Sequence, residues 1–237
     1  MPELPEVHTT IKGINKNVIG LKILDVWTDY FSQSLLYKDK PVVKNKIYFK
    51  KNFKPLVINT KIKKARRRAK NILIDLSNNQ TIIVHMKMTG HFLYGKYKKE
   101  KNKWIATEKG PLEESFNQHI HLVFSLSNKK HLVLSDVRKF AKITITPTDK
   151  LKEHPDIKNL GPEPLDSNFT LLKFKNRLEK KLFTPIKQVL MDQTVLVGIG
   201  NIYSDEILWK TGINPKRLTE KLNEGDIRLL LKNIKLI

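Results

Sequence analysis

Residues 2–7 read Pro-Glu-Leu-Pro-Glu-Val, and this short stretch decides how we interpret the rest of the chain. If Met1 is removed, Pro2 carries a secondary amine at the terminus. An α-amino group has an ordinary pKa of about 7.7–8.0, so a sizeable share of it is uncharged and nucleophilic near neutral pH. The carboxylates of Glu3 and Glu6 lie near enough in sequence to move protons. The plainer interpretation is a helix start, with Pro2 in the first turn and both glutamates at its positive end.

The composition is strongly basic. Lysine and arginine total 45 of 237 residues against 23 acidic residues, which gives a formal net charge of +22. Such an excess favours a polyanionic partner, either nucleic acid or an anionic membrane surface. No run reaches the ~18 apolar residues of a membrane span, and no signal-peptide pattern opens the chain. The sequence has no cysteine, which excludes disulfides and cysteine-bound zinc among these residues. We expect a soluble intracellular protein.

The spacing of apolar residues divides the chain into a β-rich part and a helical part. Residues 2–17 are predicted to form a helix, because Val7, Ile11 and Ile14 fall on one face. Short apolar runs between polar turns then favour a β-sandwich or barrel, with strands expected at residues 23–27, 47–49, 71–76, 81–88, 119–126, 131–135 and 143–146. The lysine-rich residues 96–109 are expected to form an exposed, mobile loop.

Three prolines between residues 148 and 166 indicate a linker, and helical spacing begins at residue 168. We therefore predict an α+β protein of two domains. Residues 1–147 form an N-terminal helix plus a β-sandwich, residues 148–166 form the interdomain linker, and residues 167–237 form a helical domain.

Two kinds of segment in the β-rich part are candidates for chemistry. Residues 61–70 read KIKKARRRAK before an apolar strand; they are either a solvated basic loop or a phosphate-contacting edge with Lys70 directed inward. Two turns carry Met88 and, in the sequence Asp-Val-Arg-Lys-Phe-Ala, Arg138 and Phe140. Met88 and Phe140 fit a core, but methionine and phenylalanine also serve as wedges between DNA bases.

The helical part contains a candidate phosphate site. Residues 186–192 are predicted to form a helix, followed by an apolar turn with two glycines and by a second helix that Asn201 caps and Gly212 ends. A helix start that follows glycines suits a phosphate. Asn201 and the lysines Lys180, Lys181 and Lys187 are the expected contacts, although Asn201 could equally be a plain helix cap.

Six segments resemble, in their order, the formamidopyrimidine-DNA glycosylases (Fpg), relatives of endonuclease VIII, and the resemblance is closest to Fpg. They are the opening, residues 61–70, the two turns, and the stretches Leu-Gly-Pro-Glu-Pro-Leu at 160–165 and Val-Gly-Ile-Gly-Asn-Ile-Tyr at 197–203. The resemblance implies a helix–two-turn–helix motif in the helical domain. It implies catalytic roles for Pro2, Glu3, Glu6 and Lys70, and DNA contacts by Met88, Arg138, Phe140 and Asn201.

The implied activity is base-excision repair: a DNA glycosylase and AP lyase that acts on duplex DNA through a Schiff base on Pro2. Oxidised purines, 8-oxoguanine and formamidopyrimidine, are the implied substrates, and oxidised pyrimidines are the second choice. A non-catalytic or lyase-only damaged-DNA-binding protein on the same scaffold is the alternative, and basic charge alone leaves a generic RNA-binding protein open. We expect a monomer in a prokaryotic cytoplasm, associated with the nucleoid and without membrane contact.

The sequence departs from the family pattern in two places. Family members usually bind one zinc in a C-terminal finger; this sequence stops at Ile237 without cysteine, so we expect no finger and no cofactor, whether through truncation or naturally. In the second turn, Val137, Lys139 and Ala141 replace a proline, an arginine and a glycine of the family. That turn is therefore expected to be less rigid.

Overall fold

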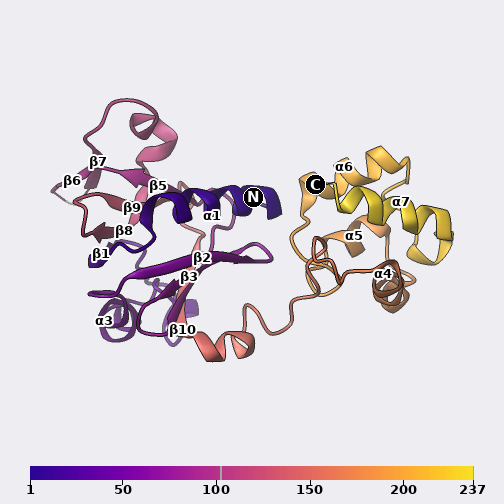
Figure 1. Cartoon of the computed structure of the whole chain (residues 1–237), viewed down its shortest axis with the longest axis horizontal. Coiled ribbons are helices and arrows are strands. Elements are labelled where there is room, and N and C mark those ends of the chain that lie inside the picture. The colour runs from indigo at the N-terminus through magenta and orange to yellow at the C-terminus, as the bar shows by residue number, and fades with distance from the viewer. Residues whose placement is uncertain (102, 237) are drawn as a thin grey trace. The chain divides into compact units, whose positions relative to one another are not determined.

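The computed structural model describes residues 1–101 and 103–236, and these form two compact units (Figure 1). The β unit consists of Met1–Pro2, Glu6–Arg67 and Asn71–Lys152. The helical unit consists of the chain from Glu153 onward together with the short segments Glu3–Pro5 and Arg68–Lys70. Within the described residues, no helix has the length and apolar character needed to span a membrane.

Two four-stranded sheets build the β unit. One has the order β1 (Ile23–Thr28), β8 (Ile120–Leu126), β9 (His131–Ser135), β5 (His91–Gly95). The other has the order β10 (Lys142–Pro147), β4 (Gln80–His85), β3 (Asn71–Leu76), β2 (Ile62–Arg68). Strand β3 is buried along its whole length, as expected for a strand whose two faces are both covered. The β-sandwich predicted from the sequence is confirmed.

The first helix, α1 (Leu4–Val18), packs its apolar face into the core of the sandwich. The predicted positions Val7, Ile11 and Ile14 are all buried. The side chain of Asn15 fixes the helix to β2, since it accepts from the amide of Ala65 at 2.7 Å and donates to the carbonyl of the same residue at 2.9 Å.

One predicted strand is wrong. Residues 47–49 lie in a helical segment made of α2 (Lys46–Tyr48), the π-helix η2 (Phe49–Phe53) and α3 (Lys54–Val57). Asn45 starts this segment, because its side chain accepts from the amides of Ile47 and Tyr48. Phe49, Phe53 and Val57 are buried four residues apart, which is the spacing of one helix face. The prediction rested on the three consecutive apolar residues at 47–49 and did not take the four-residue spacing into account.

The predicted loop at 96–109 is also wrong. Most of it is a hairpin of β6 (Tyr97–Glu100) and β7 (Lys103–Ala106). Tyr97 is buried, and the ring of Trp104 lies 6.1 Å from that of Trp27 on β1. A few aromatic contacts with the first sheet therefore order a segment whose lysines dominate its composition.

The helical unit contains α4 (Leu171–Leu178), α5 (Ile186–Met191), α6 (Asn201–Thr211) and α7 (Glu224–Ile234). These helices share one apolar core, which includes Phe174, Leu190 and Leu230. Helix α6 ends as predicted at Gly212, whose φ of 66° is left-handed. Short 3₁₀ turns complete the chain at Leu35–Tyr37, Pro111–Glu113, Ser115–Gln118, Thr148–Glu153, Glu179–Lys181 and Thr219–Lys221.

Candidate functional site

A buried carboxylate occupies the start of helix α6. The side chain of Glu3, 2% exposed, accepts hydrogen bonds from the amides of Gly200 at 2.5 Å, Ile202 at 2.9 Å and Tyr203 at 3.3 Å. The first amides of a helix lack intrahelical partners and carry partial positive charge. Glu3 supplies both the missing acceptor and the negative charge, and the amide of Leu4 adds a bond to the carbonyl of Gly198 at 3.0 Å.

This arrangement corrects the predicted role of Asn201 as the helix cap. The capping position belongs to Gly200, Asn201 is the first helical residue, and the cap is the side chain of Glu3. Asn201 is exposed. Its proposed contact with the DNA backbone stays a prediction.

Lys70 lies in the turn between β2 and β3 and is 5% exposed. The two residues before it are held by the stretch that begins at Leu160. The guanidinium of Arg68 donates to the carbonyls of Leu160 at 2.9 Å and Gly161 at 2.7 Å. A single oxygen of Glu163 accepts from Arg68 at 3.1 Å and from the amide of Ala69 at 2.7 Å. The tip of the basic segment is thereby fixed, and Lys70 with it.

Gly200 is where the carboxylate and the lysine come together. A Cβ atom on Gly200 would lie 2.5 Å from Oε1 of Glu3 and 2.8 Å from Nζ of Lys70. The backbone angles of Gly200, φ −128° and ψ −148°, lie outside the left-handed region. Glycine is therefore required at position 200 because there is no room for a side chain. The carboxylate of Glu3 and the ammonium of Lys70, which come from separate segments of the chain, occupy the space.

Pro2 and Glu6 belong to the β unit. Helix α1 begins at Leu4, so its first-turn proline is Pro5 and the expected placement of Pro2 inside the helix is wrong. Pro2 is half-buried, directly before Glu3 in the chain, and Glu6 is exposed in the first turn of α1. Their catalytic roles stay predictions.

The three predicted wedge residues form one cluster on the β unit. Met88 and Phe140 are 47% and 46% exposed. The guanidinium of Arg138 donates to Sδ of Met88 at 2.9 Å and lies 4.5 Å from the ring centroid of Phe140. Two turns, one after β4 and one after β9, thus present a methionine, an arginine and a phenylalanine side by side.

A buried aspartate joins these two turns. Asp136 is completely buried and accepts from the hydroxyl of Tyr30 at 3.1 Å, from the amide of Ala141 at 2.8 Å and from the hydroxyl of Thr89. The hydroxyl oxygen of Thr89 accepts in turn from the amide of Arg138 at 3.1 Å. Burial, together with the charge of Asp136, raises the pKa of Tyr30 well above its ordinary value. No sequence motif indicated that Asp136 and Thr89 join the two turns.

Two predicted phosphate contacts are paired with carboxylates. Nζ of Lys187 on α5 lies 2.7 Å from Asp205 on α6, and Nζ of Lys181 lies 2.9 Å from Asp192. Burial works to raise the pKa of Asp192, but hydrogen bonds from Thr194 and Lys181 bring it below its ordinary value. A phosphate would have to compete with both carboxylates for these lysines.

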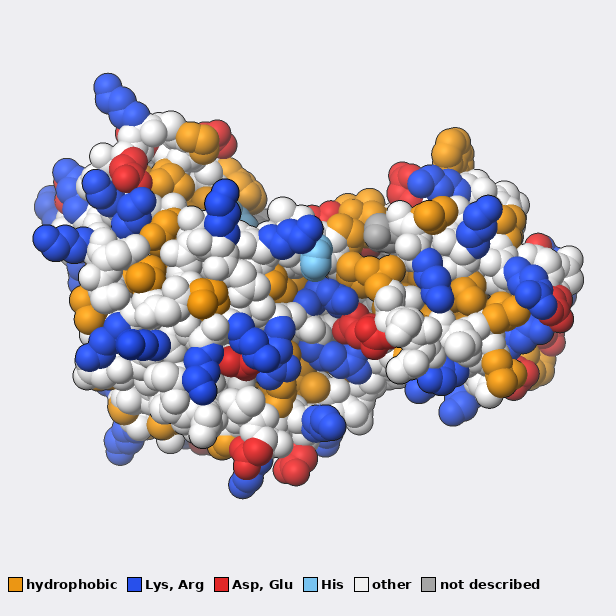
Figure 2. Space-filling view, viewed as in Figure 1, with side chains coloured by type: hydrophobic (Ala, Val, Ile, Leu, Met, Phe, Trp, Pro, Cys, Tyr) orange, Lys and Arg blue, Asp and Glu red, His pale blue; other side chains and the backbone are white. Residues whose placement is uncertain are grey.

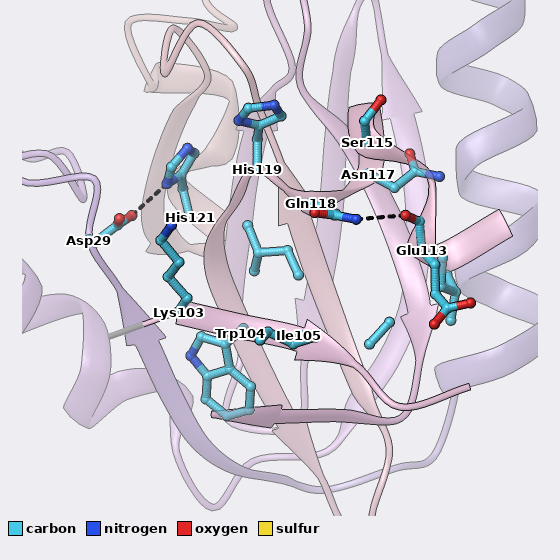
Figure 3. Close-up of a pocket in the computed structure, with 13 residues that line it drawn as sticks. Asp29, Lys103, Trp104, Ile105, Glu113, Ser115, Asn117, Gln118, His119 and His121 are labelled. Atoms are coloured by element: carbon cyan, nitrogen blue, oxygen red, sulfur yellow. Dashed lines mark hydrogen bonds and ion pairs between the residues drawn. The ribbon is translucent and has the colours of Figure 1, made fainter. Parts of the chain in front are cut away.

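A cavity of about 640 Å³ in the β unit was not indicated by any sequence motif (Figure 3). Trp104 lines one side, and Asp29 and His121 form an ion pair of 2.7 Å at another. Burial works to raise the pKa of Asp29, but the hydrogen bonds and charges of His121 and Lys139 lower it overall. Among the described residues, no three His, Cys, Asp or Glu side chains are grouped so that they could hold a metal ion.

A β-sandwich whose turns present Met88, Arg138 and Phe140 together, and a helical unit whose α6 binds a carboxylate beside a lysine, define the class of helix–two-turn–helix DNA glycosylases. Family models match both parts: the formamidopyrimidine-DNA glycosylase N-terminal domain over residues 1–143 and the formamidopyrimidine-DNA glycosylase H2TH domain over residues 160–237. The chain belongs to the formamidopyrimidine-DNA glycosylase family.

Individual relatives agree with this assignment. Formamidopyrimidine-DNA glycosylases of Pelotomaculum thermopropionicum and Desulforamulus reducens are 37% and 34% identical, over 99% of this chain and 75% of their own length. A solved complex between the Lactococcus lactis Fpg and abasic-site DNA superimposes with a TM-score of 0.80 at 28% identity, covering 99% of this chain and 76% of that one. A Lactococcus lactis complex with DNA that contains FAPY-dG gives the same TM-score and identity.

Proposed function

We propose that the chain is a base-excision DNA glycosylase for oxidised purines that also cleaves the resulting abasic site. The observation that carries this proposal is the convergence of Glu3 and Lys70 at Gly200, in a chain of the Fpg family. A non-catalytic DNA-binding protein could use the Glu3 carboxylate as a helix cap, but it would not need a buried lysine beside that carboxylate.

The first step opens the sugar. The lesion nucleotide leaves the base stack, because its reacting carbon is inaccessible in the duplex. The amine of Pro2 attacks C1′ and the bond from C1′ to the base breaks; the departing base takes up the proton that the amine loses. The bond from C1′ to the ring oxygen then breaks as Glu3 protonates that oxygen, which leaves the iminium between C1′ and Pro2. Glu3 is then ionised, which is the form that three amide donors complement, and its charge stabilises the iminium on Pro2.

The second step cleaves the strand. The nitrogen of a proline iminium has no N–H proton to lose, so it keeps its positive charge and withdraws electrons from the neighbouring C2′–H bond. Loss of that proton expels the 3′-phosphate in β-elimination. Lys70 serves as a proton donor in the elimination steps, since it is fixed beside Glu3.

We assign recognition of the lesion to a wedge cluster, which consists of Met88, Arg138 and Phe140. Met88 and Phe140 are apolar and exposed, as suits side chains that enter a gap between bases. Arg138, which contacts both side chains, is proposed to face the base that has lost its partner. Met88, Arg138 and Phe140 together would fill the volume vacated by the extruded nucleotide.

Borohydride trapping tests the proposal. Protein processed to begin at Pro2 is mixed with a duplex containing an abasic site, reduced, and analysed by intact mass and peptide mapping. We expect one covalent adduct, located on Pro2. Protein that retains Met1 is the matched control, because the same nitrogen is then an amide and cannot form the iminium. An adduct located on a lysine, or an equal yield from the control, would overturn the mechanism.

A further inference from the structure

The turn at residues 136–141, which carries Arg138 and Phe140, needs a further interaction to hold its shape. Asp136 fixes its ends, but the turn must also hold Lys139 in the left-handed region, with φ 52°, a conformation unfavourable for any residue except glycine. Neither proline nor glycine occurs in residues 136–141. Some other interaction has to keep this turn in its observed shape.

Lys44 provides that interaction. Its side chain comes from a distant segment and is only 8% exposed, and its ammonium donates to the carbonyl of Lys139 at 2.7 Å. The ammonium also lies 5.1 Å from the ring centroid of Tyr37. Burial of a lysine charge is unfavourable unless polar partners compensate it. The hydrogen bond to the carbonyl of Lys139 compensates the buried ammonium and, at the same time, holds that carbonyl in place.

The segment that contains Lys44 is itself anchored. The amide of Val43 donates to the carbonyl of Ile143 on β10 at 2.9 Å, and Val43 is completely buried. The other end of Lys139 is also held, since its ammonium lies 3.4 Å from Asp29, the partner of His121 in Figure 3. This outer pair is half-exposed and contributes little. The buried bond from Lys44 is the stronger of the two restraints on residue 139.

We propose that Lys44 is a positioning residue for the wedge cluster: it holds the turn at residues 136–141 in the shape that presents Arg138 and Phe140. Lys44 thereby compensates for the rigidity that this turn lacks because it contains neither proline nor glycine. The consequence for catalysis rests on the proposed function, whereas the consequence for the turn itself does not.

Hydrogen–deuterium exchange of the free protein tests the first consequence. The amide of Arg138 donates to Thr89 in the other turn, and the amides of Lys139 and Ala141 donate to Asp136. These amides exchange only when the turn opens. In Lys44→Met, which keeps the length of the side chain without its donors, we expect these amides to exchange about tenfold faster, the effect of losing one charge-assisted hydrogen bond. Lys44→Arg retains donors and should restore slow exchange.

Lys40→Met is the matched control, because it removes the same charge from an exposed position in the same segment. If Lys44→Met does not fold, Lys44→Gln takes its place, since its shorter amide cannot reach the carbonyl of Lys139. Unchanged exchange at the three amides in the Lys44 variant, or equal acceleration in the Lys40 control, would overturn the proposal.

Single-turnover rates test the second consequence. Excision of 8-oxoguanine opposite cytosine requires a base pair to be opened, whereas elimination at a preformed abasic site does not. Lys44→Met should slow excision about tenfold and leave elimination nearly unchanged. Equal losses on both substrates would contradict a role in the wedge. Absence of both reactions in the unsubstituted protein would refute the proposed function but leave the exchange result standing.

Discussion

Glu3 links the chemistry of the site to the stability of the helical unit. Its carboxylate binds amides at positions 200, 202 and 203, so the residue directly after the proposed nucleophile also caps a helix near the other end of the sequence. Both roles depend on the negative charge and on both oxygens of this side chain. A neutral isostere keeps the shape of the side chain but removes its charge and half of its acceptors.

Glu3→Gln is therefore expected to lower both activity and stability. Its NH₂ group would face an amide donor of α6, and that donor would lose its partner. We expect a loss of about 1–3 kcal/mol in the free energy of unfolding, measured by urea denaturation. Base excision should fall by about 10²–10⁴-fold in single-turnover assays. Unchanged stability would show that the amides at the start of α6 do not depend on this carboxylate.

Gly200→Ala tests the geometry at the meeting point of the two charged groups. The added Cβ would approach the carboxylate of Glu3 to 2.5 Å and the ammonium of Lys70 to 2.8 Å, so both must move. Overpacking of this kind costs about 1–3 kcal/mol, and a displacement of about 1 Å lowers activity about 10²-fold. Gly13→Ala is the matched control, because nothing lies within 4 Å of its added Cβ. Equal activities of the two variants would contradict the assigned geometry.

For single residues, the sequence identified candidate catalytic side chains but did not identify the groups to which they are hydrogen-bonded. Glu3 and Lys70 stand out through the family motifs, but the partners of Glu3 lie almost 200 residues away and no local pattern encodes them. For the same reason the sequence assigned the cap of α6 to Asn201, a residue type that commonly caps helices. Glu163 lay in a quoted motif, yet its bond to the amide of Ala69 became visible only in the fold.

At the scale of elements, α5 and α6 share an ion pair that bears on DNA binding. Nζ of Lys187 lies 2.7 Å from Asp205, and the two side chains are 27% and 54% exposed. An exposed pair of this kind contributes about 0.2–1 kcal/mol, so a phosphate can displace the carboxylate at small cost. The pair holds the lysine in an extended position without preventing its use.

Substitution of either partner should change DNA affinity in opposite directions. Lys187→Met should weaken binding and reduce the slope of log K against log salt concentration by about 0.9, the value for one phosphate contact. Asp205→Asn should strengthen binding about two- to fivefold, because the competing carboxylate is gone. Fluorescence anisotropy at several salt concentrations measures both effects. A slope in Lys187→Met equal to that of the unsubstituted protein would exclude Lys187 as a phosphate contact.

The elements themselves follow the sequence where one face is consistently apolar. Helix α1 and strand β3 are examples, since burial in the core and the local pattern agree. The predictions at 47–49 and 96–109 failed for different reasons. At 47–49 a local signal, the cap by Asn45 and a helical spacing of aromatic residues, set the structure. At 96–109 a tertiary contact, the packing of Trp104 on Trp27, outweighed local composition.

At the scale of the whole molecule, charge is distributed rather than concentrated. Lys and Arg side chains are spread over the visible surface in Figure 2. On this face the basic residues do not gather into a single patch, although the formal net charge of the chain is +22. Long-range attraction to DNA follows from the total charge, whereas orientation on the DNA requires a few placed groups, and Arg138 is the one proposed above.

The pH dependence of stability follows from groups in both units. The pKa values of Asp29 and Asp192 are lowered overall from the ordinary 3.8, so each contributes stability that is present above that value and lost as pH falls through the lowered pKa. Burial lowers the pKa of His131 from 6.5, so its contribution is lost as pH falls below neutral. On the alkaline side, burial raises the pKa of Tyr97 from 10.0 to about 12, and stability is lost as pH rises through that range.

We therefore expect the free energy of unfolding to be greatest between about pH 7 and pH 10 and to fall on both sides. His131 should supply the first decline below neutral pH, because its ring accepts from the amide of Tyr97 at 3.4 Å and packs 5.0 Å from the ring of Trp104, a site suited to the neutral form. His131→Gln should flatten the profile between about pH 5 and pH 7. His8→Gln, at an exposed position on α1, is the matched control and should leave the profile unchanged. Urea denaturation across this pH range measures both, and a decline in His131→Gln as steep as in the control would exclude His131 as its source.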